Sequence, residues 1–159
     1  MKLDRNQLLA SLKESYREEF DEISRRLGVA PKPIDSLIES TGSGEMLAAM
    51  IGITGAGVRV TASVVVDKPV AMGTYAAAYA ALRGKTQEDE VTLFGEFSDA
   101  LTENALAKAG ITELSVTPAQ IMEGQNFRNV PSKKSAVDSF SMPFELPEGM
   151  LYINMSVHA

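Results

Sequence analysis

The side chains best suited to chemistry in this sequence are acidic ones on one face of a predicted helix over 90–109. At about 100° per residue, four polar side chains of this segment fall within an arc of roughly sixty degrees. These four are Thr92, Glu96, Asp99 and Glu103, which we call the acidic stripe. Carboxylates accept hydrogen bonds and attract cations, so this face suits docking against a basic groove.

No basic side chain within the helix neutralises the acidic stripe. Lys and Arg are absent between Lys85 and Lys108, so no acid of the stripe has a basic partner three or four residues away. Like charges at this spacing repel by about a few tenths of a kcal/mol per pair. The ordinary interpretation is a solvated surface on which acids happen to cluster. The sharper interpretation is a docking surface on which Glu96 and Asp99, one turn apart, reach the same target.

Apolar periodicity predicts the elements that position this face. Helical spacing predicts an amphipathic N-terminal helix over 1–28, ended by Gly28. The segment 29–45 is rich in Pro, Ser and Gly and is predicted to be a connector. The core of the single domain, which spans the whole chain over 1–159, is predicted over 46–159.

The core segment is predicted to contain a sheet interrupted by two middle helices. The first middle helix begins at Asp67-Lys68-Pro69, and the second ends at Gly110. The predicted strands cover 46–53, 58–66, 113–124 with a break at Pro118, 140–144 and 151–157. This order predicts an α+β fold with a mainly antiparallel sheet, two packed middle helices and an extra N-terminal helix.

Composition excludes several classes of protein. The 159 residues, 45% hydrophobic and 23% charged, fit one compact domain with its own core. The chain has no Cys and one His, His158, which excludes a thiolate site and a multi-His metal site. A net charge of −6 without a basic cluster argues against nucleic acid as a partner. Apolar runs are too short for a membrane span and the N-terminus is charged, so we expect a cytoplasmic protein.

The stretch GEFSDALTENALAKAG resembles the signature helix of the CheC/CheX family of chemotaxis phosphatases. In that family a Gly-Glu-x-x-Asn core is followed by small residues and a Gly-Asn pair. Gly95, Glu96 and Asn104 match this pattern, while Asp99 stands where the family has Asn. Downstream, LSVTPAQIMEG is similar to the family's strand that ends in Pro and then Gly, and MPFELPEGMLYINMSV resembles its closing hairpin. The resemblance covers most of the chain from about Met46 onward.

The resemblance implies a CheC-like fold and a hydrolase activity in chemotaxis or related two-component signalling. Proteins of this family remove the phosphoryl group from the aspartyl-phosphate of CheY-like response regulators. By resemblance, Glu96 pairs with the regulator's active-site Lys and residue 99 orients the attacking water. Further binding residues implied are Glu103, Thr92 and Asn104. No cofactor of its own is implied, because the regulator holds the Mg²⁺, and the single acidic helix resembles CheX, which implies a homodimer.

The departure at Asp99 leaves two functions open. An amide donates and accepts hydrogen bonds, whereas a carboxylate only accepts and adds negative charge beside the phosphoryl oxygens. A loose phosphoryl-transfer transition state gains little from a strong base. Asp99 therefore either positions water for dephosphorylation or marks a non-catalytic module that binds a receiver domain through a decayed site. A structural dimer with a merely solvated acidic face is a third alternative.

Overall fold

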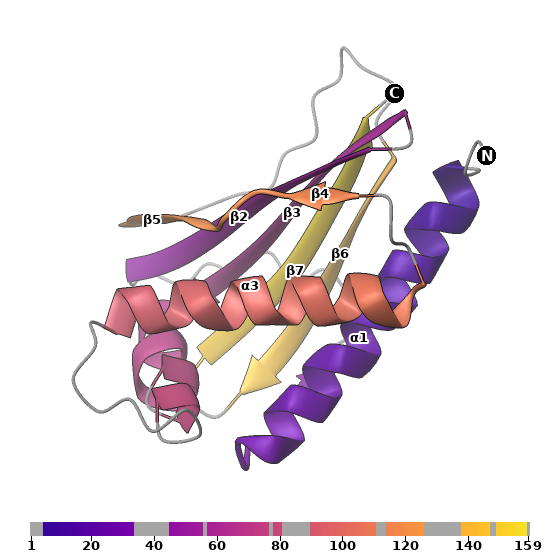
Figure 1. Cartoon of the computed structure of the whole chain (residues 1–159). Helices are drawn as coiled ribbons and strands as arrows, with labels where there is room; N and C mark the ends of the chain where they lie inside the picture. The colour runs from indigo at the N-terminus through magenta and orange to yellow at the C-terminus, as the bar shows by residue number, and fades with distance from the viewer. Residues whose placement is uncertain are drawn as a thin grey trace.

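The computed structural model describes residues 5–33, 45–55, 57–76, 78–80, 90–110, 114–125, 138–146 and 149–158. Within these ranges, helices pack on one face of a sheet. In Figure 1, α3 crosses in front of the strands and α1 runs diagonally beside them. The helical elements are α1 (Arg5–Arg26), the π-helix η1 (Val70–Ala76) and α3 (Glu90–Lys108). The strands are β1 (Lys32–Pro33), β2 (Glu45–Gly55), β3 (Val58–Asp67), β4 (Ser115–Val116), β5 (Gln120–Gln125), β6 (Asp138–Leu146) and β7 (Gly149–His158).

The seven strands form one sheet in the order β1-β6-β7-β3-β2-β4, and β5 also pairs with β2. Every pairing is antiparallel. The β2–β3 hairpin closes with Gly55 opposite Val58, and Gly57 at the turn has a φ of +77° that favours glycine. The predicted α+β fold with a mainly antiparallel sheet is therefore confirmed.

One hydrophobic core lies between the helices and the inward face of the sheet. Alternate residues of β2, β3, β6 and β7 point into it, as the period of two predicted. The other face of the sheet also buries apolar side chains, so the strand over 46–53 is buried on both sides near its start. This smaller cluster contains Met46, Ala48, Val65 and Tyr152.

Helix α1 ends where the sequence predicts and packs into the same core. Gly28 adopts a φ of +75°, and the Val29 N–H reaches the Ser24 carbonyl at 2.8 Å, which completes a Schellman cap. The buried Tyr16 hydroxyl donates to Thr102 of α3 at 2.8 Å, and this bond joins the two helices across the core.

Two segments differ in detail from their sequence-based descriptions. The predicted connector over 29–45 contains the short strand β1, which pairs with β6, and residues 34–44 lie outside the described ranges. The first middle helix is wound as a π-helix over Val70–Ala76. Its five-residue steps place Val70 near Tyr75 and Ala71 near Ala76, and all four are buried. Residues 81–89, which precede α3, lie outside the described ranges.

None of the helices in the described ranges is long and apolar enough to cross a membrane.

Candidate functional site on the face of α3

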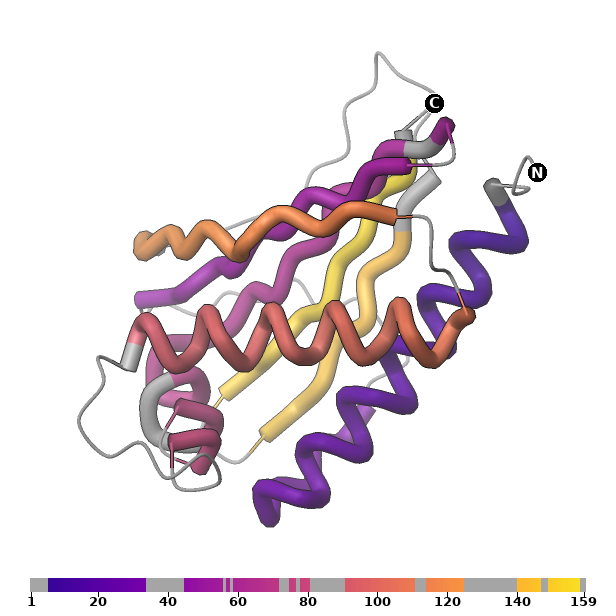
Figure 2. Tube along the Cα trace, viewed as in Figure 1, coloured from indigo at the N-terminus to yellow at the C-terminus, as the bar shows by residue number. Residues whose placement is uncertain are grey.

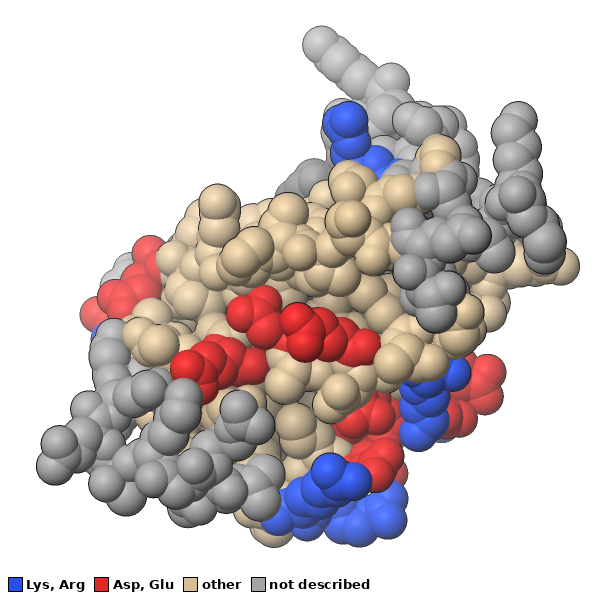
Figure 3. Space-filling model, viewed as in Figure 1, with Lys and Arg blue, Asp and Glu red and all other residues tan. Residues whose placement is uncertain are grey.

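Helix α3 presents two opposite faces, as its sequence predicts. Four side chains at helical spacing are fully buried on the inward face: Phe94, Phe97, Leu101 and Ala105. On the other side, Thr92 and Glu103 are exposed, while Glu96 and Asp99 are half-buried. Figure 3 shows acidic side chains gathered over α3. Burial of the apolar face therefore turns the acidic stripe outward.

A strand edge borders the acidic stripe along one side. In Figure 2 the segment that holds β4 and β5 runs along α3. The approach is close: a Cβ added to Gly95 would lie 3.5 Å from Cδ1 of Ile121 in β5. Gly95 therefore allows α3 to pack against β5 at van der Waals distance, beside the half-buried Glu96.

Asp99 forms a hydrogen bond with this strand edge. Its Oδ1 accepts a hydrogen bond of 2.9 Å from the backbone N–H of Ala119, in the link between β4 and β5. The carboxylate is therefore directed toward the strand edge by a backbone donor. An aspartate has two oxygens with about four acceptor positions, so this bond leaves capacity for other donors.

Burial beside the strand edge raises the pKa of Asp99 above its ordinary value. The Ala119 N–H lowers the pKa of Asp99 in part, and the negative charges of Glu103 and Glu96 raise it further. Asp99 therefore takes up a proton more readily than a solvated aspartate does. Its hydrogen bond to Ala119 also joins α3 to the link between β4 and β5.

The remaining predicted residues lie at different distances from Asp99 along the helix. Glu96 and Glu103 flank it by one turn, and Thr92 lies about two turns before it. Asn104 is exposed but lies about 140° around the helix from Asp99, at 100° per residue. The structure thus brings four of the five predicted side chains onto one stripe and leaves Asn104 outside it.

Sequence reasoning did not identify Thr117, Ala119 and Gly52 as part of this site. The Thr117 N–H reaches the Gly52 carbonyl at 2.9 Å, and the Gly52 N–H returns to Thr117 Oγ1 at 2.9 Å. The available signal was the break predicted at Pro118. A break shows where a strand is interrupted, but it does not reveal which helix receives the freed backbone donor.

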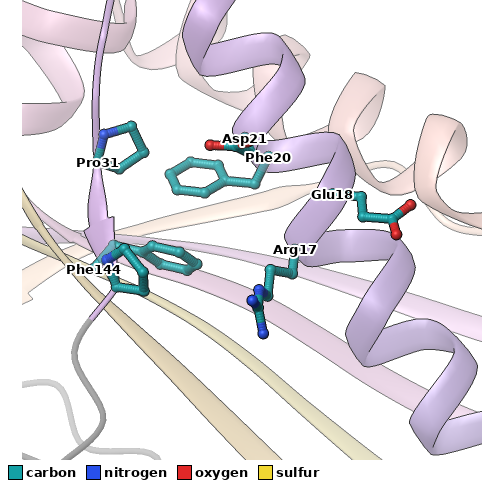
Figure 4. A pocket seen from close by; sticks show the side chains of 7 residues that line it. Arg17, Glu18, Phe20, Asp21, Pro31 and Phe144 are labelled. Carbon is teal, nitrogen blue, oxygen red and sulfur yellow. The ribbon is translucent and has the colours of Figure 1, made fainter.

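A separate hollow lies between α1 and β1 (Figure 4). Its volume is about 280 Å³, and it is lined by Arg17, Glu18, Phe20, Asp21, Pro31, Pro33 and Phe144. The two acids of this hollow already pair with cations, Glu18 with Lys108 at 3.5 Å and Asp21 with Arg25 at 3.6 Å. None of the predicted site residues lines it, so the acidic stripe remains the candidate site.

Across the described ranges, no group of three His, Cys, Asp or Glu side chains is arranged to hold a metal ion. The side chains of the acidic stripe offer carboxylate and hydroxyl oxygens that accept hydrogen bonds. Its chemistry is that of acceptors on a helix, with one acceptor anchored to a strand edge.

Proteins similar to this chain were found among solved structures. No protein-family model and no curated protein sequence matches this chain. A CheC-like superfamily protein from Shewanella sp. PV-4 is similar with a TM-score of 0.71 at 16% identity, covering 94% of this chain and 98% of that chain. The chemotaxis protein CheX from Vibrio vulnificus is similar with a TM-score of 0.68 at 17% identity, covering 92% and 99%.

A third similar structure is a complex. CheX from Borrelia burgdorferi, solved with CheY, BeF₃ and Mg²⁺, has a TM-score of 0.56 at 13% identity, covering 92% of this chain and 97% of that chain. At these identities the likeness concerns the fold, and folds are shared among different activities. The resemblance found in the sequence is confirmed at that level: the chain has a fold of the CheC/CheX type.

Proposed function

We infer that the protein binds a phosphorylated CheY-like response regulator through the acidic stripe and promotes hydrolysis of its aspartyl-phosphate. The observation that carries this proposal is the outward position of Glu96 and Asp99 on α3, the helix that resembles the family's signature helix. The fold is of the CheC/CheX type, and one protein of that fold was solved with CheY. Such a partner belongs to the cytoplasm, where we place this protein as well.

The proposed roles follow from the chemistry of each carboxylate. In an aspartyl-phosphate the regulator's Mg²⁺ and Lys already neutralise much of the phosphoryl charge. A helper protein therefore has to dock and to place a water in line with the phosphorus. Glu96 is the docking group for a basic side chain of the regulator. Asp99, held by Ala119 through Oδ1, accepts a hydrogen bond from the water with its remaining acceptor positions.

The second candidate function is a non-catalytic module that binds a receiver domain. It is favoured by the charge around Asp99: this carboxylate lies between Glu96 and Glu103, whose charges add to the effect of burial in raising its pKa. Three acids side by side attract a basic groove but repel phosphoryl oxygens. Under this alternative the protein binds the regulator and leaves the lifetime of the phosphate unchanged.

The test follows loss of phosphate from a phosphorylated CheY-like receiver of the same organism. The receiver is measured alone, with the native protein, and with the Glu96→Gln, Asp99→Asn and Glu14→Gln variants. Glu14 is an exposed acid on α1, away from the stripe, and serves as the charge-matched control. We expect acceleration by the native protein and the control, and a loss of roughly tenfold with Glu96→Gln, the change that corresponds to one ion pair of about 1.4 kcal/mol.

The other outcomes separate the alternatives. Acceleration by Asp99→Asn alone, with binding by both proteins, supports the non-catalytic module. Binding that persists after charge reversal at Glu96, Asp99 and Glu103 supports the third alternative, in which the face is only solvated. The homodimer implied by the resemblance to CheX stays a prediction, and a monomeric mass in solution would contradict it.

A further inference from the structure

The link between β4 and β5 contains one residue more than the strand it faces. Val116 pairs with Ile53 and Gln120 pairs with Met50, so two residues of β2 oppose three residues of the link. An extra residue on one strand defines a β-bulge, which bends the strand and takes backbone groups out of the ladder. Pro118 lies at its centre and has no N–H to lose.

The bulge is fixed to β2 at one point. Thr117 forms two hydrogen bonds of 2.9 Å with the backbone of Gly52, one through its N–H and one through Oγ1. Gly52 suits this approach, because an added Cβ would lie 3.3 Å from Thr117 Oγ1. We call this pair of bonds the Thr117 clamp.

The next backbone donor after Pro118 leaves the sheet. The Ala119 N–H points to α3 and binds Asp99 Oδ1 at 2.9 Å. One end of the bulge is thus attached to β2 and the other end to the candidate site. The N–H that binds the Asp99 carboxylate therefore lies two residues after the clamp.

We propose that Thr117 is a positioning residue: by clamping the bulge to Gly52 it fixes the Ala119 N–H that orients Asp99. The inference deepens the proposed function, on which its catalytic consequence rests. The Thr117 clamp would also determine which atom of residue 99 faces a partner. With Oδ1 engaged by Ala119, an aspartate presents an acceptor outward, whereas an asparagine held in the same way presents its NH₂ donor.

The first experiment needs no regulator. The pKa of Asp99 is measured by carboxyl NMR titration in the native protein, in Thr117→Val and in Thr117→Ser, with Asp99→Asn used to assign the resonance. Valine keeps the shape of threonine but lacks the hydroxyl oxygen, whereas serine keeps the hydroxyl oxygen. We expect the pKa of Asp99 to rise in Thr117→Val, because the Ala119 bond that lowers it is weakened, and to stay unchanged in Thr117→Ser. An unchanged pKa in folded Thr117→Val would overturn the proposal.

The second experiment measures single-turnover loss of phosphate from the receiver at increasing concentrations of each variant. We expect Thr117→Val to lower the maximal rate by roughly fivefold to tenfold, the range of one hydrogen bond. The half-saturating concentration should not change, because docking through Glu96 is intact, and Thr117→Ser should restore the rate. A change confined to the half-saturating concentration would contradict positioning.

Failure of the proposal and failure of the proposed function look different. If the native protein does not accelerate phosphate loss, the phosphatase function is wrong, and the titration still decides whether the clamp positions Asp99. If Thr117→Val does not fold, as judged by circular dichroism, Ala119→Pro removes the N–H that binds Asp99 and leaves Thr117 in place. That variant should also raise the pKa of Asp99, and an unchanged value would overturn the proposal.

Discussion

The carboxylate of Asp99 accepts one backbone hydrogen bond, which stabilises its ionised form, and lies beside two negative charges, which destabilise that form. Burial is the main reason that its pKa is raised, and Glu103 and Glu96 add to the effect. A raised pKa in the folded state means that the protonated form is favoured by folding. Ionised Asp99 therefore costs stability at neutral pH, and this cost disappears as the pH falls below the pKa of the unfolded chain.

This sign gives a prediction for Asp99→Asn. An amide keeps an oxygen for the Ala119 N–H but carries no charge, so we expect the variant to be more stable than the native protein at neutral pH. The gain should be about a few tenths of a kcal/mol, of the size that a like-charge neighbour on a helix costs. Urea unfolding measures it, and the difference should shrink as the pH falls through the range in which Asp99 is protonated. A difference that grows at low pH would contradict the assigned pKa direction.

At the scale of elements, two buried hydroxyl pairs tie α1 to the helices it crosses. Tyr16 donates to Thr102 of α3 at 2.8 Å, and Ser24 and Tyr75 of η1 lie 3.0 Å apart. Burial raises the pKa of the Tyr16 and Tyr75 hydroxyls, so both remain protonated. Each pair replaces hydrogen bonds to water within an otherwise apolar contact, and this fixes how the helices sit against each other.

A double-mutant cycle tests the first pair. Tyr16→Phe leaves the buried Thr102 hydroxyl without its partner, and we expect a loss of about 1–2 kcal/mol in the free energy of unfolding. Combined with Thr102→Val, the loss should be smaller than the sum of the single losses by about 1 kcal/mol. Tyr16→Phe with Ser24→Ala is the matched control, because these side chains belong to different pairs. Their effects should add, and coupling in that control would indicate a general rearrangement of α1.

The elements show which parts of the site can be predicted from a sequence. The buried face of α3 was predictable because Phe94, Phe97 and Leu101 repeat with the period of the helix, and the acids are then outward by geometry. The contact of Asp99 with Ala119 was not predictable, because it depends on the register of β4 and β5 against β2. Gly52 and Thr117 are 65 residues apart in the sequence, and neither residue type by itself indicates a functional site.

At the scale of the whole molecule, the acidic stripe depends on a core that α1 completes. Side chains of α1 are buried in the same cluster as those of the sheet, η1 and α3. Phe20 joins these layers: its ring centroid lies 4.6 Å from that of Phe144 in β6 and 5.8 Å from that of Tyr75 in η1. Tyr75 in turn lies 4.8 Å from Phe97 of α3, which carries the stripe on its other side.

This continuity predicts that the chain unfolds as one unit, as the single-domain interpretation of the sequence requires. Amide hydrogen exchange should give the same opening free energy for buried amides of α1 and of β7. Phe20→Ala should lower both together by about 3–5 kcal/mol, the range for removing a buried ring. Arg17→Ala, at an exposed position on the same helix, serves as the control and should change neither by more than about 0.5 kcal/mol. Exchange of α1 at a lower free energy than β7 would instead make α1 a separate unit, and the position of α3 would then be set by the sheet and η1 without it.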